Sequence, residues 1–161
     1  MVAKGNPKKI YDIADLARGD VRFINRQAGS GTRFLLDLLL EREHVAAAAI
    51  RGYEQCEYTH AAVAAFVASG MADAGFGLEV PARQFKLEFL PLQQERYFLL
   101  CDARALDGPA LPQLLELLRS AAFRKQVDAL PGYRADDAGT VMHLHEAFAS
   151  LRSKRGRART Q

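Results

Sequence analysis

The residues best suited to bind a ligand lie between Asn25 and Arg33, in the run Asn-Arg-Gln-Ala-Gly-Ser-Gly-Thr-Arg. This run follows a predicted strand over residues 21–25 and opens a predicted helix. The first backbone N–H groups of a helix have no partner within it and lie at the positive end of its dipole, which suits an anion. Hydroxyls add donors, glycines let a ligand approach the backbone, and arginines add charge. The residues that would serve such an anion site are Arg26, Gly29, Ser30, Gly31, Thr32 and Arg33.

The same run also fits a plain strand-to-helix turn in which Ser30 is only the N-cap. It is not a nucleotide-binding loop, because GxxxxGK[ST] is absent and no third glycine follows Gly29 and Gly31 at the dinucleotide spacing. Ligands of a parallel α/β sheet bind at the carboxyl ends of its strands, where this run is expected to lie. We therefore predict an anion site here.

A second candidate for the same site is Glu57-Tyr58-Thr59-His60, where another helix is predicted to begin. Thr59 fits an N-cap that also contacts the ligand. The helix dipole disfavours an imidazolium at His60, so His60 would act as a neutral donor. Tyr58, Thr59 and His60 would then complete a cleft lined by two helix openings. The alternative is a plain threonine cap beside an exposed histidine.

Residues with catalytic or metal-binding chemistry do not combine into a convincing centre. Ser30, His60 and Asp73 could form a triad in principle, but G-x-S-x-G is absent, and Asp73 better fits a structural role. His143 and His145 are two residues apart on a predicted helix and therefore do not share a face. Cys56 and Cys101 belong to no metal spacing. We expect a protein that is not an enzyme and needs no metal or cofactor beyond a bound oxyanion.

The secondary-structure elements that position these residues follow from the pattern of the chain. Predicted strands alternate with predicted helices, and this alternation favours an α/β fold around a mostly parallel sheet flanked by helices. Buried strands are predicted over residues 72–76, 89–92 and 97–101, and helices over residues 60–69, 78–85, 110–120 and 123–130. A helix of about three turns is expected to follow Arg33, and a final amphipathic helix is expected over residues 141–151. The residues expected on the apolar face of the helix after Arg33 are Phe34, Leu35, Leu38 and Leu39.

Composition and charge describe an ordinary soluble chain. It has 161 residues, of which 49% are hydrophobic and 25% charged. The net charge is +3, but removing the five basic residues of the expected disordered tail, residues 152–161, leaves the first 151 residues at −2. We therefore expect no direct nucleic-acid contact from this body, no membrane association, and, without a secretory signal, a cytoplasmic location.

Five segments carry a resemblance to one family: residues 25–33, 52–54, 57–60, 65–77 and 95–97. Taken in order, they resemble the periplasmic-binding-protein-like (PBP superfamily) domain of bacterial and archaeal cytoplasm. There it is often joined to molybdate-type transcriptional regulators or to molybdopterin-biosynthesis proteins. The resemblance implies a type 2 fold with two α/β lobes around a small ligand, in which Gly29–Thr32 with Arg26 form the oxyanion loop of the second lobe and Thr59 adds a matching contact.

Compared with that family, the chain is expected to lack most of the first lobe. Residues 10–95 would form the second lobe and residues 96–151 the segment that returns to the first, all within one domain over residues 1–151. A homodimer or a partner chain would have to supply the other wall of the cleft. The resemblance implies a module that senses molybdate, tungstate, sulfate or phosphate in a regulatory or molybdenum-cofactor system. The alternative is an interaction or dimerisation module with a vestigial cleft.

Overall fold

The computed structural model describes residues 1–148; the predicted basic tail lies outside the described residues. The chain divides into two compact units. Unit 1 consists of Met1–Phe98 and Leu130–Gly132. Unit 2 consists of Leu99–Ala129 and Tyr133–Gln161, of which residues up to 148 are described.

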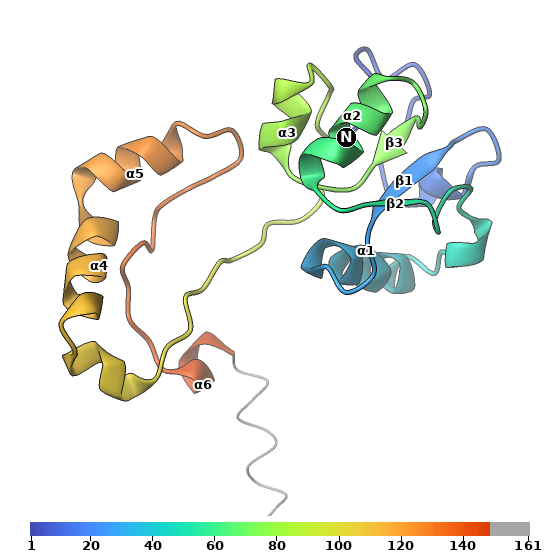
Figure 1. Cartoon of the computed structure of the whole chain (residues 1–161). Coiled ribbons are helices and arrows are strands. Elements are labelled where there is room, and N and C mark those ends of the chain that lie inside the picture. The colour runs from blue at the N-terminus through green and yellow to red at the C-terminus, as the bar shows by residue number, and fades with distance from the viewer. Residues whose placement is uncertain (149–161) are drawn as a thin grey trace, which may run out of the picture. The chain divides into compact units, whose positions relative to one another are not determined.

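A small parallel sheet lies at the centre of unit 1 (Figure 1). Its strands are β1 (Phe23–Arg26), β2 (Cys56–Glu57) and β3 (Ala74–Gly75), in the order β2-β1-β3. All four residues of the central strand β1 are buried. Val2 extends the sheet beyond β3 through antiparallel bridges to Ala74 and Glu88. The predicted α/β class with a parallel sheet is therefore confirmed for unit 1.

Helices cover the two faces of this sheet, and the alternation of side chains along β1 decides which helix packs where. Phe23 packs in one core cluster with Leu36, Leu39 and Leu40 of α1 (Gly31–Arg42). Ile24, the next residue, packs in a second cluster with Val63 and Val67. These two valines belong to α2 (His60–Ala68), which lies with α3 (Glu79–Gln84) on the other face (Figure 1). Two short 3₁₀ turns, Ala14–Ala17 and Ala47–Ala49, complete unit 1.

The apolar face predicted for α1 is only half right: Leu39 is buried and Leu35 packs against the core cluster, but Phe34 and Leu38 do not. The helix buries Leu36, Leu39 and Leu40, whereas Phe34 and Leu38 are 65% and 45% exposed. The run Phe-Leu-Leu-Asp-Leu-Leu-Leu offers two overlapping stripes at helical spacing, so periodicity alone cannot choose between them. The packing of α1 against β1 makes that choice.

Unit 2 is helical in its described part. It contains a 3₁₀ turn (Ala103–Asp107), α4 (Ala110–Arg119), α5 (Ala121–Asp128) and a single turn, α6 (Leu144–Ala147). Two of these helices confirm the predictions over residues 110–120 and 123–130. The predicted helix over residues 141–151 is reduced to α6 within the described residues, and residues 149–151 lie outside them.

Two predicted strands, over residues 89–92 and 97–101, are wrong. Phe89 and Leu90 pack at the edges of the two core clusters of unit 1, but their backbone joins no strand ladder. Residues 91–100 are all exposed and belong to no helix or strand. A strand needs a neighbouring strand to pair its N–H and C=O groups, and an apolar run does not supply one. Within residues 1–148 there is also no helix long and apolar enough to cross a membrane.

Candidate functional site

The candidate site lies at the carboxyl edge of the sheet in unit 1, where three strand-to-helix connections meet. β1 ends at Arg26, β2 at Glu57 and β3 at Gly75. Because the three strands are parallel and adjacent, the turns that follow them lie at the same edge, before α1, α2 and α3 (Figure 1). The sheet therefore brings the two predicted segments, residues 26–33 and 58–60, to one edge.

The turn between β1 and α1 is held by its own backbone and by one hydroxyl. Gly29 adopts φ +84°, a left-handed conformation that favours glycine. Ser30 is the N-cap of α1, and its Oγ accepts a hydrogen bond of 3.1 Å from the Arg33 amide. A hydroxyl that accepts in this way still has its own hydrogen to donate. The amides of Gly31 and Thr32, in the first turn, also have no acceptor within the helix.

The opening of α2 repeats this arrangement from the neighbouring strand. Thr59 is extended, and its Oγ1 accepts a 3.0 Å hydrogen bond from the Ala62 amide, which confirms the predicted N-cap. Both Thr59 and Tyr58 are exposed, with the Tyr58 side chain 74% accessible. The hydroxyls of Ser30 and Thr59 can therefore each cap a helix and also donate a hydrogen bond to a ligand.

Arg26 joins the two helix openings. The residue is only 8% exposed, and its guanidinium donates to the Tyr58 carbonyl at 3.0 Å and to Gln27 Oε1 at 3.1 Å. Both acceptors are neutral, and no carboxylate within residues 1–148 forms an ion pair with it. Two of the five N–H groups of a guanidinium are therefore used, and three have no protein acceptor in the described chain. Buried charges are almost always paired, so this cation is unusual.

Arg33 has a different environment. Its guanidinium stacks 3.9 Å from the centre of the Tyr53 ring, lies 3.4 Å from an oxygen of Asp37, and donates to the carbonyls of Arg26 and Tyr53. The Tyr53 hydroxyl also bonds to Asp37. Arg33 therefore braces the end of β1 against the loop at Tyr53. Sequence reasoning missed Asp37 as its partner, although their spacing of four residues on one helix is typical of an ion pair.

His60 is the first residue of α2 and lies close enough to Arg26 to feel its charge. Burial, and secondarily the positive charge of Arg26, lower the pKa of His60 below its ordinary value of 6.5. Its Nδ1 is fully covered and has no hydrogen-bond partner in the described structure. A lowered pKa favours the neutral ring at physiological pH; the role of His60 as a donor to a ligand stays a prediction.

Asp73 lies outside this cluster. Its carboxylate accepts from the Arg22 guanidinium at 2.9 Å and from the Arg22 amide at 2.8 Å, before β1 begins. The geometry agrees with a structural role and does not assemble the triad of Ser30, His60 and Asp73. Among the described residues, no three His, Cys, Asp or Glu side chains lie together as metal ligands would.

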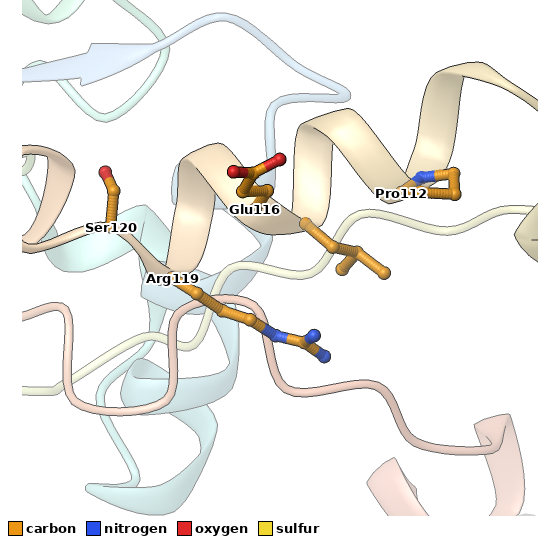
Figure 2. A pocket seen from close by; sticks show the side chains of 5 residues that line it. Pro112, Glu116, Arg119 and Ser120 are labelled. Atoms are coloured by element: carbon orange, nitrogen blue, oxygen red, sulfur yellow. The ribbon is translucent and has the colours of Figure 1, made fainter.

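Unit 2 carries a separate hollow along α4 (Figure 2). It has a volume of about 560 Å³ and is lined by Pro112, Leu115, Glu116, Arg119 and Ser120. The charged ends of Glu116 and Arg119 point away from each other, and Arg119 Nε donates to the Gly139 carbonyl at 2.9 Å. This hollow brings no buried charge toward a ligand, unlike the sheet edge of unit 1.

Comparison with known proteins identifies the family. Over 141 residues the chain is 38% identical to the uncharacterized protein YvgK of Bacillus subtilis (strain 168), covering 88% of this chain and 45% of YvgK. It is 34% identical over 94 residues to an uncharacterized protein in the ferredoxin 2Fe-2S gene 5' region of Clostridium pasteurianum, covering 58% of this chain and 83% of that protein. The chain thus spans about half the length of YvgK. No solved structure matches. Because residues 1–119 match the family described as the PBP superfamily domain, the chain belongs to that family.

Proposed function

We propose that this domain is a ligand-binding module for a small oxyanion, with molybdate or tungstate as the leading candidates and sulfate and phosphate as the others. One observation carries the proposal: Arg26, a residue only 8% exposed, has no carboxylate partner in the described chain. Taking a charge out of water without a counter-charge is costly. An anion bound at the carboxyl edge of the sheet would supply that counter-charge.

The groups around Arg26 are suited to bind a small anion with several acceptor oxygens. The openings of α1 and α2 offer amide donors and two cap hydroxyls from neighbouring turns, and helix N-termini favour negative charge. Superfamily membership adds independent support for ligand binding. The residues proposed to form the site are Arg26, Gly29, Ser30, Gly31, Thr32, Arg33, Tyr58, Thr59 and His60.

Within this set the arginines have different tasks. Arg26 would contact the anion, since its guanidinium retains N–H groups without an acceptor in the described chain. Arg33 would act through the backbone, because its guanidinium is already bound to Tyr53, Asp37 and the carbonyl of Arg26. The proposal assigns binding and not catalysis to this chain. Its place in a transcription-regulatory or molybdenum-cofactor system rests on the sequence resemblance alone.

The test is a thermal-shift titration of the full chain with molybdate, tungstate, sulfate and phosphate at fixed ionic strength. A ligand that binds only the folded state adds about 2.7 kcal/mol of stability at a hundredfold excess over its dissociation constant. We expect a saturable rise with one or more of these anions, and loss of that rise in the double variant Arg26→Ala/Ser30→Ala.

Arg51→Gln is the matched control, because the exposed Arg51 lies beside Phe23, at the opposite end of β1 from Arg26. It should keep the full rise. A flat response of the wild-type chain to all four anions, or an unchanged rise in the double variant, would contradict the proposal.

A second candidate function is an interaction or dimerisation module, and the observation that favours it is the exposure of Leu99 and Leu100, at 74% and 81%. Adjacent leucines this accessible mark a surface that another protein could cover. Such a partner chain, or a second copy of this chain, would also supply another wall of the cleft. Light scattering tests this: a concentration-dependent mass that Leu99→Ser/Leu100→Ser abolishes supports it, and a strict monomer at high concentration contradicts it.

A further inference from the structure

Unit 2 has almost no core of its own within the described residues. None of its helices buries a residue, and Ala135 is the single buried apolar residue among those described. Yet α4 carries a stripe of leucines at helical spacing, a pattern typical of a helix that packs against another surface. The residues of this stripe, all of them half-buried, are Leu111, Leu114, Leu115 and Leu118. The described part of unit 2 therefore covers α4 only in part.

The hollow along α4 shows which face of the helix stays open (Figure 2). Its lining residues on the helix are spaced i, i+3, i+4 and i+7, so they share one face: Pro112, Leu115, Glu116 and Arg119. The remaining lining residue is Ser120, the C-cap of α4. No other element within residues 1–148 lines the hollow, which shares Leu115 with the leucine stripe. A helical face that combines apolar and charged side chains in this way fits a second helix.

The two charged residues of this face are not used up within unit 2. Glu116 and Arg119 are both exposed, and their spacing of three residues would allow an ion pair. Their charged ends nevertheless point away from each other (Figure 2), and Arg119 donates instead to the Gly139 carbonyl. Within residues 1–148 neither side chain forms an ion pair. The open face therefore offers one positive and one negative charge, one turn apart, to a partner.

We propose that this face of α4 is a homodimer interface, on which α4 of a second copy packs antiparallel about a two-fold axis between Glu116 and Arg119. In such a contact each Glu116 faces Arg119 of the partner subunit, so the symmetry makes two ion pairs from one pair of residues. A parallel contact would oppose like charges instead, which is costly. The inference rests on the second candidate function, dimerisation, and adds its surface and its partner. One face of a short helix is smaller than a standard interface, so the dimer is weak and depends on concentration.

Charge reversal tests the contact, and sedimentation equilibrium of the full chain measures it. Glu116→Arg opposes positive charges twice in each dimer, and Arg119→Glu opposes negative charges twice. We expect the wild type to dimerise reversibly, and either variant to raise the dimer dissociation constant about tenfold or more. An equimolar mixture of the two variants should associate again, because every positive side chain of one then faces a negative side chain of the other.

Lys125→Glu is the matched control, because it reverses an exposed charge on α5 that does not line the hollow. It should leave dimerisation unchanged, and circular dichroism should show equal helix content in all variants. A dimer that tolerates both reversals, or two variants whose mixture does not associate, would overturn the inference and leave dimerisation standing. Loss of that dimer in Leu99→Ser/Leu100→Ser would then locate the interface at those leucines. A strict monomer of the wild type at high concentration would overturn the inference and the dimerisation candidate together.

Discussion

The two units use similar apolar content in different ways. Unit 1 contains two core clusters and nearly all the buried apolar residues of the described chain, among them Phe23, Ile24 and Leu36. In the described part of unit 2, Ala135 alone falls in that class, while Leu117 and Leu144 are 57% and 49% exposed. Unit 1 therefore has a core of its own, which positions the candidate site, whereas unit 2 presents apolar surface that its described residues leave open.

The sharpest test of this contrast is a core substitution in unit 1. Leu36 is 0% exposed in the cluster between α1 and β1. Leu36→Ala should lower the free energy of unfolding by about 2–5 kcal/mol, because it removes buried methyl groups and leaves a cavity. Urea denaturation followed by circular dichroism measures this. A loss below about 1 kcal/mol would mean that the core of unit 1 is not packed as described.

A backbone substitution in unit 1 should have the next largest effect. Gly52 has φ +94°, and a Cβ there would collide with the carbonyl oxygen of Phe23 in β1. Gly52→Ala should therefore cost about 1–3 kcal/mol of folding free energy and disturb the Tyr53 loop that braces Arg33. Gly19→Ala is the control, since its Cβ meets nothing within 4 Å. Equal unfolding midpoints for the two variants would argue against this loop geometry.

Acidification should reveal a smaller contribution from the Arg22–Asp73 pair. Hydrogen bonds from the Arg22 side chain hold the pKa of Asp73 below its ordinary value of 3.8. The folded state then binds fewer protons than the unfolded state near that pH, so the stabilisation is present above about pH 4 and is lost as the pH falls through the lowered pKa. Unfolding midpoints between pH 6 and pH 3 should fall less steeply for Asp73→Asn than for the wild type. Parallel profiles would show that the pair contributes no pH-dependent stability.

The smallest effect is expected in unit 2. Leu117 on α4 is 57% exposed. Leu117→Ala should change the free energy of unfolding by no more than about 0.5 kcal/mol, because the side chain is mostly exposed and its truncation removes little buried apolar surface. The same urea denaturation used for Leu36→Ala measures it. A loss comparable to that of Leu36→Ala would show that unit 2 is packed against a surface in solution.

The sequence predicts secondary structure correctly where local preferences and tertiary packing favour the same structure. Ser30 and Thr59 were recognisable as N-caps, and the strand before Arg26 and the helix after it followed from their patterns. The strand predicted over residues 97–101 is wrong because its backbone has no neighbouring strand to pair with in the described structure. The buried face of α1 was ambiguous because five leucines and a phenylalanine occupy both possible stripes between residues 34 and 40.

The site was only partly predictable for a similar reason. Residue types placed Arg26 and His60 near a helix opening, but burial of an unpaired charge is a property of the fold and has no sequence signature. A Cβ added to Gly77 would lie 2.9 Å from His60 Nδ1, so the backbone at Gly77 passes close to the ring of a residue 17 positions earlier, and no local pattern indicates this. Asp37 could have been found from its spacing to Arg33, while the stacking of Tyr53 on Arg33 could not.

The most direct test of the account compares Arg26→Gln with the wild type in urea denaturation, with and without molybdate. If Arg26 is a largely buried cation whose counter-charge is the bound anion, the variant should be as stable as the wild type without molybdate, or more stable. The reason is that the substitution removes a charge without a counter-charge. The same variant should lose the stabilisation that molybdate gives the wild type. A variant that is less stable without molybdate and yet keeps the full molybdate-induced gain would contradict the account, because Arg26 would then be a structural residue and the anion would bind elsewhere.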